Sequence, residues 1–474
     1  MNTNLATTWS AQEIATALHT VCSGNWVSNG ISKDSRTLQP GNVFIALQGP
    51  NTDGHHHLEA AFAAGAMGVI VSALPASLSK DDPRIILVPD TLQALHDLAT
   101  AARARTQAQL IAITGSFGKT STKDILASLL AAFGKVYASE RSFNNHWGVP
   151  FTLANLPTDV VFGVIEIGMN HQGEIAPLAQ LVSPHIALIT TVRAMHMENL
   201  GSLENIANEK ADIFANMQSN GVAIVNHDDT TFERVVNRAR ERGLAIITFG
   251  KHPLANFCLI DYTTTAMGTH IKADIHGKPF EYSLPVVIGE HWVVNSLAML
   301  AVIHALGIDI QQAASGFSNM VLPEGRGMRH QVPVTGGEII VIDESYNAGP
   351  DSMRAAITVL GAMQPTANGR RIAILGDMRE IGEQSAAKHA SLTQDLVANN
   401  IHCVFTCGKE MTHLYNTLPQ DMQISHKLQA VDLIPELRDF VRAGDICMIK
   451  GSKGQYADRG HMYALVEALL HLKE

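Results

Sequence analysis

Short apolar runs alternate with amphipathic helical stretches along most of the chain. Apolar runs that each lead into a helix predict parallel strands, in a sheet that helices cover on both faces. We expect strands at 42–47, 67–71, 109–114, 160–165, 186–190, 222–225, 245–248, 338–342, 371–375, 403–406 and 447–449. We expect helices at 11–18, 58–64, 91–105, 119–133, 203–217, 229–240, 290–306, 352–363, 385–398, 432–442 and 462–471. The predicted fold class is α/β.

Two stretches interrupt this pattern and divide the chain. Between 256 and 285 the period shortens to alternation with Thr, Tyr and His, which predicts a local antiparallel excursion. The Pro- and Gly-rich stretch Leu322-Pro-Glu-Gly-Arg-Gly327 is typical of a linker. A length of 474 residues corresponds to about three domains. We therefore expect a small α/β domain at 1–88, a central P-loop parallel-sheet domain at 89–321 and a doubly wound, Rossmann-like domain at 322–474.

The composition is that of an ordinary globular protein. Hydrophobic residues make up 46% and charged residues 16% of the chain, so it can bury several cores and does not resemble a disordered sequence. Lys plus Arg number 34 against 44 Asp plus Glu, a formal net charge of −10, and only 5% of residues are aromatic. General nucleic-acid binders have a basic surface and aromatic stacking platforms, so we expect no nucleic-acid partner.

The cysteines and the amino terminus indicate a reduced, cytoplasmic protein. Five cysteines spread over the chain do not suggest a disulfide framework, and Cys403 and Cys407 lack the second pair that a zinc site needs. The start, Met1-Asn-Thr-Asn-Leu-Ala6, has no basic region followed by an apolar core, so we expect no secretory signal. The most apolar long stretch, 292–308, is too short and too polar to span a bilayer.

The strongest local signal is a glycine-rich turn between a predicted strand and a predicted helix, Thr114-Gly-Ser-Phe-Gly-Lys-Thr-Ser121. Glycines let backbone amides point at phosphate oxygens, Lys119 supplies charge, and Thr120 can place its hydroxyl on Mg²⁺. Ile113 stands at the first glycine of the full P-loop pattern, so the match is to the pattern's core. The alternative is a plain turn between strand and helix. We expect phosphate binding by Gly115, Ser116, Phe117, Gly118, Lys119, Thr120 and Ser121.

A P-loop alone leaves the chemistry open among switch GTPases, motors, kinases and ligases. The chain has no N-K-x-D motif for reading guanine, which argues against a GTPase. Glu166 ends the predicted strand that follows the P-loop, where a carboxylate can hold the metal that bridges nucleotide phosphates. An isolated glutamate at the end of a strand can equally be a solvated cap, so both interpretations stay open on this residue alone.

Further motifs, taken together with the P-loop, resemble the Mur ligase family of ATP-dependent amide-forming enzymes over nearly the full chain. The motifs are Asp34-Ser35-Arg36, Pro40-Gly-Asn-Val-Phe-Ile-Ala-Leu47, Thr52-Asp-Gly54-His55, Phe143-Asn144-Asn145-x-x-Gly148-x-Pro150 and Val164-Ile-Glu-Ile-Gly-Met-Asn-His-Gln-Gly-Glu-Ile175. The first three are similar to the family's uridine-nucleotide-binding domain, and the fourth resembles its substrate loop. His146 and Trp147 stand where the family commonly has Asp-Ile.

The resemblance implies an activity. The run Asn170-His-Gln-Gly-Glu-Ile175 is most similar to the family member that uses ATP to join D-alanyl-D-alanine to UDP-N-acetylmuramoyl-tripeptide. That reaction passes through an acyl phosphate and gives the UDP-MurNAc-pentapeptide precursor of peptidoglycan. On this resemblance the chain is a monomeric ligase of cell wall synthesis that uses ATP, Mg²⁺ and small-molecule substrates. Domain 1–88 would bind the UDP-muramoyl substrate, 89–321 would bind ATP, and 322–474 would complete the ligase site.

The resemblance also implies roles for individual residues. The catalytic residues would be Lys119, Glu166, His196 and Lys210. ATP would contact the P-loop, Asn295, the hinge arginine Arg326 and the ribose-binding aspartate Asp343. The substrate-binding residues would be Ser35, Arg36, Gly54, His55, Asn144, Asn145, Asn170, His171, Tyr346 and Asn347. One Mg²⁺ would be held by Thr120 and Glu166, and a second by His196 and Lys210. Lys210 would act as a carbamate, which turns a repelling ammonium into an oxygen ligand. The loops 375–382 and 450–452 would lie near the incoming amine.

Without the resemblance, the residues around the second metal position have plainer interpretations. His196 is then an ordinary loop residue, and Lys210 is a surface lysine on a helix that Ser202 can cap. We expect Glu209 and Asp212, on either side of Lys210, on the solvated face of that helix.

Two positions depart from the family's pattern. His291 and Asn295 lie four residues apart on one helix face, but Trp292 stands at the first asparagine of the H-N-x-x-N pattern that lies beside adenine. Gly349 replaces the second asparagine of the usual N-A-N-P. Asn295 is still the expected adenine contact, and Trp292 either stacks on the base or packs in the core.

Two rival functions stay open. One is a sister ligase, either the diaminopimelate- or lysine-adding Mur ligase or a folylpolyglutamate synthase, although the D-N-P-R signature of the diaminopimelate-adding relative is absent. The other is a P-loop ATPase module that hydrolyses ATP and forms no bond. ADP release that requires both a carboxylate and an amine substrate would separate these classes.

Overall fold

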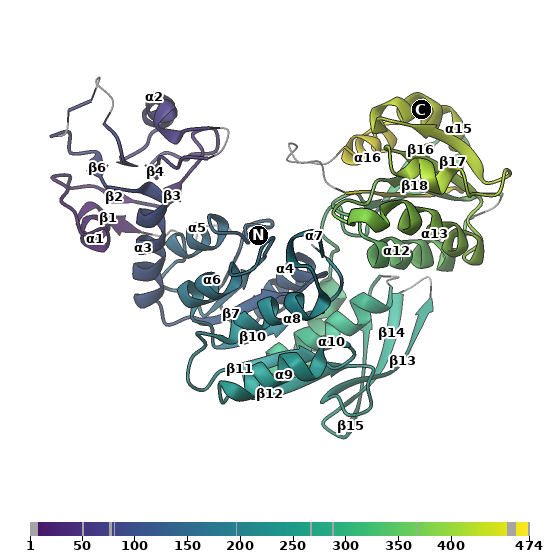
Figure 1. The fold of residues 1–474 in the computed structure, drawn as a ribbon, viewed down its shortest axis with the longest axis horizontal. Coiled ribbons are helices and arrows are strands. Elements are labelled where there is room, and N and C mark those ends of the chain that lie inside the picture. The colour runs from purple at the N-terminus through teal and green to yellow at the C-terminus, as the bar shows by residue number, and fades with distance from the viewer. Residues whose placement is uncertain are drawn as a thin grey trace.

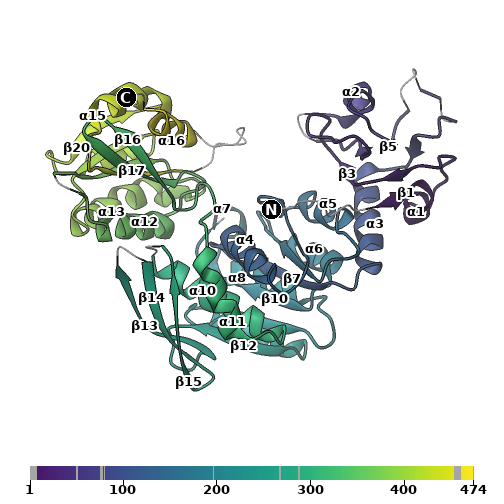
Figure 2. The ribbon, with the colours of Figure 1, turned by 180° about the vertical axis from the view of Figure 1, so that it is seen from behind.

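The computed structural model forms three units, with the first and third standing apart over the central one (Figure 1). It describes residues 8–49, 52–74, 78–79, 81–195, 197–265, 268–286, 289–366, 368–452 and 461–472, and every structural statement below concerns these. The view from behind shows the same separation of the two outer units (Figure 2). All three units combine helices with largely parallel sheets, so the predicted α/β class is confirmed.

The first unit is built on a parallel sheet of order β3-β4-β5-β6. Alternate residues of its strands face opposite sides, so Ile45 and Ile70 pack toward α1 and α3 while Phe44 and Val69 pack toward α2. The elements are β1 (Trp9–Ser10), α1 (Ala11–Ala17), β2 (Val27–Ser28), β3 (Ile31–Ser32), β4 (Val43–Ile45), α2 (Leu58–Ala63), β5 (Gly68–Val71), β6 (Ile85–Leu87) and α3 (Thr91–Ala104).

Polar contacts seat the first unit on the central one. Trp9 Nε1 donates to Ala154 O at 2.9 Å, at the end of α5 (Gly148–Ala154). The Ile31 amide donates to Asn155 Oδ1 at 2.8 Å, and Asn155 Nδ2 donates back to Ile31 O at 3.1 Å. These bonds satisfy backbone groups at the end of α5 and on an edge strand of the first sheet, which sets the orientation of the two units.

The central unit contains a nine-stranded sheet of order β15-β14-β13-β12-β11-β10-β7-β9-β8. Pairing is parallel from β8 through to β13 and antiparallel among β13, β14 and β15, which confirms the predicted excursion and shows that it extends the same sheet. The strands are β7 (Gln109–Thr114), β8 (Val136–Ala138), β9 (Phe162–Glu166), β10 (Ile186–Ile189), β11 (Val222–Asn226), β12 (Ala245–Gly250), β13 (Phe257–Thr265), β14 (Gly268–Ile275) and β15 (Lys278–Leu284).

Helices cover both faces of this sheet. One face packs on α4 (Lys119–Leu130), α10 (Glu290–Ala305) and α11 (Ile310–Ser315), and the other on α3, α5, α6 (Ile175–Val182), α8 (Leu203–Ala211) and α9 (Phe232–Glu241). A short helix, α7 (Met197–Leu200), precedes α8. Most of α10 is buried, which explains why its sequence is apolar on all sides. Over the described residues, no helix has the length and apolar character needed to cross a membrane.

The third unit contains a six-stranded sheet of order β16-β17-β21-β18-β19-β20, in which only the β16–β17 pairing is antiparallel. The elements are β16 (Met328–Val334), β17 (Gly337–Glu344), α12 (Pro350–Ala362), β18 (Arg371–Gly376), α13 (Ser385–Ala398), β19 (Cys403–Cys407), α14 (Met411–Tyr415), β20 (Gln423–Lys427), α15 (Ile434–Phe440), β21 (Ile446–Lys450) and α16 (Tyr463–Leu470). One face packs on α12, α13 and α14 and the other on α15 and α16, so the unit is doubly wound.

The expected strands did not include the two edge strands of this sheet, β16 and β20. Val332 is the one buried residue of β16, which also contains Pro333, and Ser425 is the one buried residue of β20. Edge strands with polar residues and proline do not produce a continuous apolar run. The helix expected at 203–217 is also shorter than predicted, because α8 ends at Ala211 and a 3-10 turn follows at Asp212–Phe214.

Candidate active site

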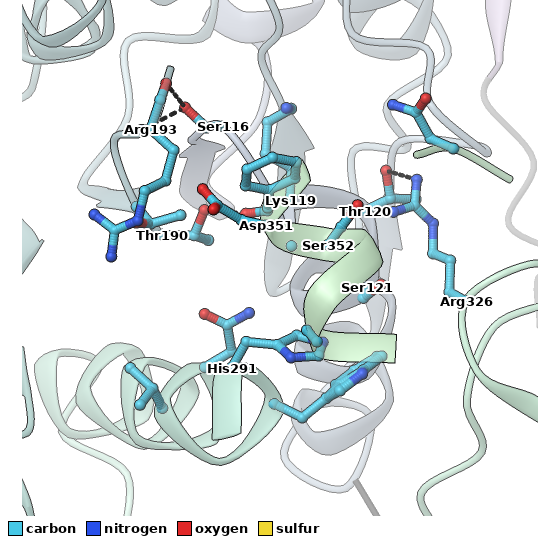
Figure 3. Close-up of a pocket in the computed structure, with 18 of the residues that line it drawn as sticks. Ser116, Lys119, Thr120, Ser121, Thr190, Arg193, His291, Arg326, Asp351 and Ser352 are labelled. Atoms are coloured by element: carbon cyan, nitrogen blue, oxygen red, sulfur yellow. Dashed lines mark hydrogen bonds between the residues drawn. The ribbon is translucent and has the colours of Figure 1, made fainter. Parts of the chain in front are cut away.

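A cavity of about 570 Å³ opens where the central unit faces the third unit (Figure 3). Strand register explains its floor, because Ile113 pairs with Glu166 and Thr114 pairs with Ile189, so β7, β9 and β10 end at the same edge. Twelve of the residues expected to have a catalytic or binding role line the cavity: Ser116, Phe117, Gly118, Lys119, Thr120, Ser121, Asn144, Glu166, Asn295, Arg326, Tyr346 and Asn347.

The P-loop has the geometry of an anion-binding turn. It connects the end of β7 to the start of α4, and the amides of Gly118, Lys119 and Thr120 have no acceptor among the described residues. Free amides at a helix N-terminus combine hydrogen-bond donors with the positive end of the helix dipole. This part of the cavity can therefore bind a phosphate group.

Two glycines allow the loop to adopt this shape. Gly115 has a φ of +148° and Gly118 a φ of +80°. A Cβ on Gly115 would lie 2.0 Å from Thr190 Oγ1, and one on Gly118 would lie 2.5 Å from Asn295 Nδ2. Both positions combine a left-handed backbone with a close neighbour, so neither accommodates a side chain.

Side-chain contacts fix the loop against the segment after β10. The Ser116 amide donates to Thr191 O at 2.8 Å, and the Ser116 hydroxyl donates to Arg193 O at 3.0 Å and accepts from the Arg193 amide at 2.9 Å (Figure 3). Thr190 Oγ1 donates to Phe117 O at 2.5 Å. The conformation of the loop therefore does not depend on a bound nucleotide.

Lys119 lies inside the loop. Its Nζ donates to Gly115 O at 2.7 Å, so the ammonium already occupies the concave side of the turn. Burial lowers the pKa of Lys119, Glu166 opposes that shift, and the nearby Arg326 lowers the pKa further. Two cations facing one buried carboxylate give the cavity a local charge that suits polyphosphate.

The hydroxyl of Thr120 connects the central and third units. Thr120 Oγ1 accepts from Arg326 Nη2 at 3.0 Å and lies 3.0 Å from Ser142 Oγ (Figure 3). Tyr346 OH donates to Ser142 Oγ at 2.6 Å, and the Arg326 guanidinium lies 4.1 Å from the Tyr346 ring centroid. Residues from both units thus meet at the first turn of α4.

Glu166 supplies a carboxylate oxygen that no protein donor satisfies. The residue is 1% exposed; Oε1 accepts from Asn144 Nδ2 at 2.7 Å, and Oε2 is buried without a partner among the described residues. A buried carboxylate oxygen of this kind fits a divalent cation, and Thr120 supplies a hydroxyl in the same cavity. Over the described residues, no three His, Cys, Asp or Glu side chains form a metal cluster, so phosphate oxygens or a modified lysine would have to complete the coordination.

The structure places Lys210 in the interior and not on the surface. It is 2% exposed on α8, whose N-terminus Ser202 caps by accepting from the Asn205 amide at 3.2 Å. Burial lowers the pKa of Lys210 well below its usual value, and the charge of Lys119 lowers it further. Lys210 does not line the cavity as described, and His196, the other expected ligand of the second metal, lies outside the described residues.

The expectation that Glu209 is solvated was wrong. Glu209 is 2% exposed; Oε2 accepts from the Gly173 amide at 2.7 Å and Oε1 from the Ile175 amide at 2.8 Å. The carboxylate therefore satisfies backbone donors at the start of α6 and holds α8 against it, which outweighs the cost of burial. Asp212 is only partly exposed and forms an ion pair with Arg238.

The helix face expected to contact adenine lines the cavity. His291, Trp292 and Asn295 all contribute to it, and Trp292 and Asn295 are 5% and 8% exposed. Trp292 belongs to the hydrophobic core that α10 forms with the sheet, so its ring packs in the core and shows one side to the cavity. Burial lowers the pKa of His291, which favours the neutral imidazole.

Asp343 organises the hinge in this structure. It is 1% exposed; Oδ2 accepts from the Gly325 amide at 2.8 Å, and Oδ1 accepts from the Ser345 amide at 3.0 Å and from Ser345 Oγ at 2.6 Å. Gly325 precedes Arg326, and Ser345 precedes Tyr346. The carboxylate thereby fixes the backbone next to both residues that reach toward Thr120, and it does not itself line the cavity.

Several expected substrate residues lie away from the cavity. Ser35, Arg36, Gly54 and His55 belong to the first unit, and Asn145, Asn170 and His171 lie on central-unit loops outside the cavity lining. Asn145 Oδ1 accepts from the amides of Trp147 and Gly148 at 3.2 and 2.9 Å, so it starts α5. Arg36 pairs with Asp34 at 2.6 Å.

His55 links two segments of the first unit. Its Nδ1 lies 2.6 Å from Asp53 Oδ1, and its Nε2 accepts from the Ser72 amide at 2.9 Å. Asp53 also accepts from the His55 amide at 2.9 Å and from Gln48 Nε2 at 2.9 Å. The position between Asp53 and His55 requires glycine, because a Cβ on Gly54 would lie 2.8 Å from Ala46 Cα. The Asp-Gly-His sequence thus has a structural role of its own.

Ser142 and the pairing of Lys450 were not among the expected site features. Ser142 bridges Thr120 and Tyr346, but a lone serine before a loop motif has no recognisable spacing. Lys450 Nζ donates to Glu344 Oε2 and Asn347 O, both at 3.0 Å, and lines the cavity. Its position at the end of a predicted strand was the available signal, because ligands meet a doubly wound sheet at that edge.

Comparison with known proteins agrees with this arrangement. Models of the Mur ligase family match three stretches: the "Mur ligase family, catalytic domain" at 28–103, the "Mur ligase middle domain" at 113–303 and the "Mur ligase, glutamate ligase domain" at 328–453. A UDP-N-acetylmuramoyl-tripeptide–D-alanyl-D-alanine ligase of Rickettsia prowazekii is 33% identical over 452 residues, which cover 95% of this chain and 98% of the relative. The chain belongs to the Mur ligase family.

Other members of the Mur ligase family show the same relationship. The protein of the same name from Escherichia coli K12 is 33% identical over 393 residues, covering 82% of this chain and 83% of the relative. The structure of MurF from Acinetobacter baumannii matches with a TM-score of 0.84 and 26% identity, covering 98% of this chain and 100% of that one. The family expected from the motifs is therefore confirmed.

In this Mur ligase family member, we predict that Gly118→Ala weakens ADP binding at least about tenfold, as measured by isothermal titration calorimetry. The new Cβ would collide with Asn295 Nδ2 at 2.5 Å and distort the phosphate-binding turn. Gly243→Ala is the matched control, since Gly243 also has a positive φ, +66°, but no atom within 4 Å of its Cβ position. Equal affinity losses in the two variants would contradict the steric explanation.

A second prediction concerns acid sensitivity. Burial raises the pKa of the Asp53 carboxyl, but hydrogen bonds from His55 and Gln48 outweigh it and lower the pKa to about 2. A carboxyl whose pKa is lower in the folded chain stabilises it above the unfolded pKa, and this stabilisation disappears as the pH falls through about 2. Asp53→Asn should therefore cost on the order of 1 kcal/mol at neutral pH, allowing for solvent screening, and progressively less below pH ~4.

Thermal unfolding followed from pH 7 to pH 2.5 measures this effect. Glu59→Gln, an exposed substitution in the first turn of α2, serves as the control. A constant difference in unfolding temperature between Asp53→Asn and the unmodified chain over the whole range would rule out ionisation of the Asp53 carboxyl as the cause.

Proposed function

We propose that this chain is an ATP-dependent ligase that joins D-alanyl-D-alanine to UDP-N-acetylmuramoyl-tripeptide through an acyl phosphate. The observation that carries the proposal is a P-loop and an unpartnered Glu166 oxygen in one cavity that Arg326 and Tyr346 of the third unit also line. A phosphate-binding turn closed by a second unit suits a reaction whose intermediate must be kept from water. The relatives that bear this activity's name support the choice of substrates.

The first half of the reaction is phosphoryl transfer. The terminal carboxylate of the tripeptide attacks the γ-phosphorus of ATP, the bond to the β–γ bridging oxygen breaks, and ADP leaves. Lys119 and the free amides of the P-loop stabilise the charge on the transferring group, which is how positioning and electrostatics catalyse such steps. Thr120 and Glu166 would hold one Mg²⁺, and His196 and Lys210, the latter as a carbamate, would hold a second; the bound metal supplies positive charge to the phosphates.

The second half is capture of the acyl phosphate by an amine. The nitrogen of D-alanyl-D-alanine attacks the activated carbonyl carbon, phosphate leaves with the bonding electron pair, and the amine loses a proton. The third unit would present the dipeptide from the loops that follow β18 and β21, which the Ser452 amide joins by donating to Asp377 O at 3.0 Å. Arg326 and Tyr346 line the same cavity as the P-loop, where they would keep water from the acyl phosphate.

The first unit would hold the uridine nucleotide end of the substrate. Ser35, Arg36, Gly54 and His55 lie there, while Asn145, Asn170 and His171 lie on loops of the central unit and Asn144 lines the cavity. Asn295 would contact adenine and Asp343 the ribose after nucleotide binding. We propose the division at 1–88, 89–321 and 322–474, and a monomer that acts in the cytoplasm, where ATP is available.

The substrate assignment is tested by measuring ADP release and the mass of the product. UDP-N-acetylmuramoyl-tripeptide is supplied with D-alanyl-D-alanine, diaminopimelate, lysine or glutamate, and each component is also omitted in turn. We expect ADP release only with tripeptide and D-alanyl-D-alanine together, and a product heavier by the dipeptide less one water. Phosphate release that is equally fast without either substrate would indicate an ATPase module, and preference for another amine would indicate a sister ligase.

Lys210→Ala tests the carbamate. Burial lowers the pKa of Lys210, which favours the unprotonated amine, and this form can attack the carbon of CO₂ and release a proton. We expect the rate to fall at least about 100-fold, as for loss of one preorganised charge-stabilising group, and to recover in part with added formate or acetate. Lys272→Ala on β14, an exposed lysine, is the control. Undiminished activity of Lys210→Ala would dispose of the role.

A further inference from the structure

Lys123, one turn beyond Lys119 on α4, is a buried cation that the phosphate chemistry does not use. Its side chain is 1% exposed; Nζ donates to Ser139 O and to Arg141 O at 2.8 Å, and it forms an ion pair with Asp124 Oδ1 at 2.8 Å. Two carbonyl acceptors and one carboxylate therefore surround the ammonium. Burying a charge is costly unless it is paired and hydrogen-bonded. Lys123 meets this condition by bonding to loop carbonyls, which an apolar side chain on α4 could not do.

The carbonyls that Lys123 holds belong to the segment between β8 and α5, here called the 139–145 loop. Asn144 of this loop donates to Glu166 Oε1 at 2.7 Å, and Ser142 Oγ lies 3.0 Å from Thr120 Oγ1. Thr120 and Glu166 are the two residues whose oxygens face the position proposed for Mg²⁺. The loop therefore sets which carboxylate oxygen of Glu166 is satisfied and which one is left open.

The 139–145 loop has a backbone conformation that needs support. Arg141 has a φ of +48°, in the left-handed region that residues with a Cβ rarely adopt. The carbonyl of this same residue accepts from Lys123 Nζ. Further along, the Gly168 amide donates to Asn144 O at 2.7 Å. Lys123 thus holds the loop at Arg141, the residue with the positive φ, and the Gly168 amide, just after β9, holds it at Asn144.

We propose that Lys123 is a positioning residue for the metal–phosphate end of the cavity, acting through the 139–145 loop on Thr120 and Glu166. The inference rests on the proposed function only in taking Thr120 and Glu166 as the groups that face the bound metal. Lys123 does not line the cavity; it holds the loop that contains Ser142 and Asn144, which contact Thr120 and Glu166.

Lys123→Met keeps the length of the side chain and removes the donors. We expect ADP to bind with unchanged affinity without Mg²⁺, because the P-loop amides and Lys119 are untouched, and Mg²⁺ to strengthen ADP binding less than in the unmodified chain. The kcat should fall about 10- to 100-fold with a smaller change in KM for ATP, as expected for a displacement near 1 Å. Lys135→Met, at an exposed lysine paired with Asp159, is the matched control.

A double substitution guards against misfolding. Lys123→Met/Asp124→Asn leaves no carboxylate without its cation, and thermal unfolding shows whether each variant is folded at the assay temperature. If the variants are folded and the effect of Mg²⁺ on ADP binding equals that of the unmodified chain, the proposal is overturned.

A double-mutant cycle tests whether Lys123 acts through the loop. Asn144→Ala should lower kcat about tenfold in the unmodified chain and less than about twofold in the Lys123→Met chain, because the loop is already displaced there. Additive losses would contradict the proposal. ADP binding with and without Mg²⁺ is measured independently of product formation. A failure to form the UDP-MurNAc-pentapeptide product would therefore refute the proposed function and leave this inference still tested by binding.

Discussion

Glu166 lines the cavity, and its Oε2 is a buried carboxylate oxygen without a hydrogen-bond donor in the described part of the chain. Strand pairing brings Glu166 level with Ile113, just before the P-loop, and Asn144 satisfies the other oxygen. An unsatisfied anion in the interior is costly, which is acceptable where a cation is to be bound. The lysine of the P-loop lies close by, so the carboxylate faces positive charge even without a ligand.

The third unit participates in this arrangement through its hinge. Asp343 accepts from both sides of the hinge, which fixes the backbone next to Arg326 and Tyr346, and these two side chains reach across to Thr120 and Ser142. A nucleotide site made in this way is complete only when the two units are together. The first unit is attached separately, through backbone groups near α5, so it can hold one end of a long substrate without entering the cavity.

The sequence was sufficient for features that depend on local pattern. Apolar runs located most central strands, the glycine spacing located the phosphate turn, and motif resemblance located Thr120, Glu166 and Arg326, which the structure brings together in one cavity. It was insufficient where burial depends on distant partners. Glu209 looked like a surface residue because nothing local shows that the amides of Gly173 and Ile175 need an acceptor. Ser142 and Lys123 were not predicted for the same reason, since Lys123 donates to a carbonyl 16 residues away and Ser142 accepts from a residue 204 positions away.

The contact between Arg326 and Thr120 has a consequence for how tightly nucleotide is held. The hydroxyl that accepts from the guanidinium is also the one that, in the proposed function, would face the cation, so Arg326 would compete with the metal for Thr120. The fraction of molecules that keeps this bond would have to break it before the metal–nucleotide complex forms, which would reduce the measured affinity by that fraction. Selection can therefore tune the occupancy of the enzyme by ATP from the hinge, without altering a single residue of the glycine-rich turn.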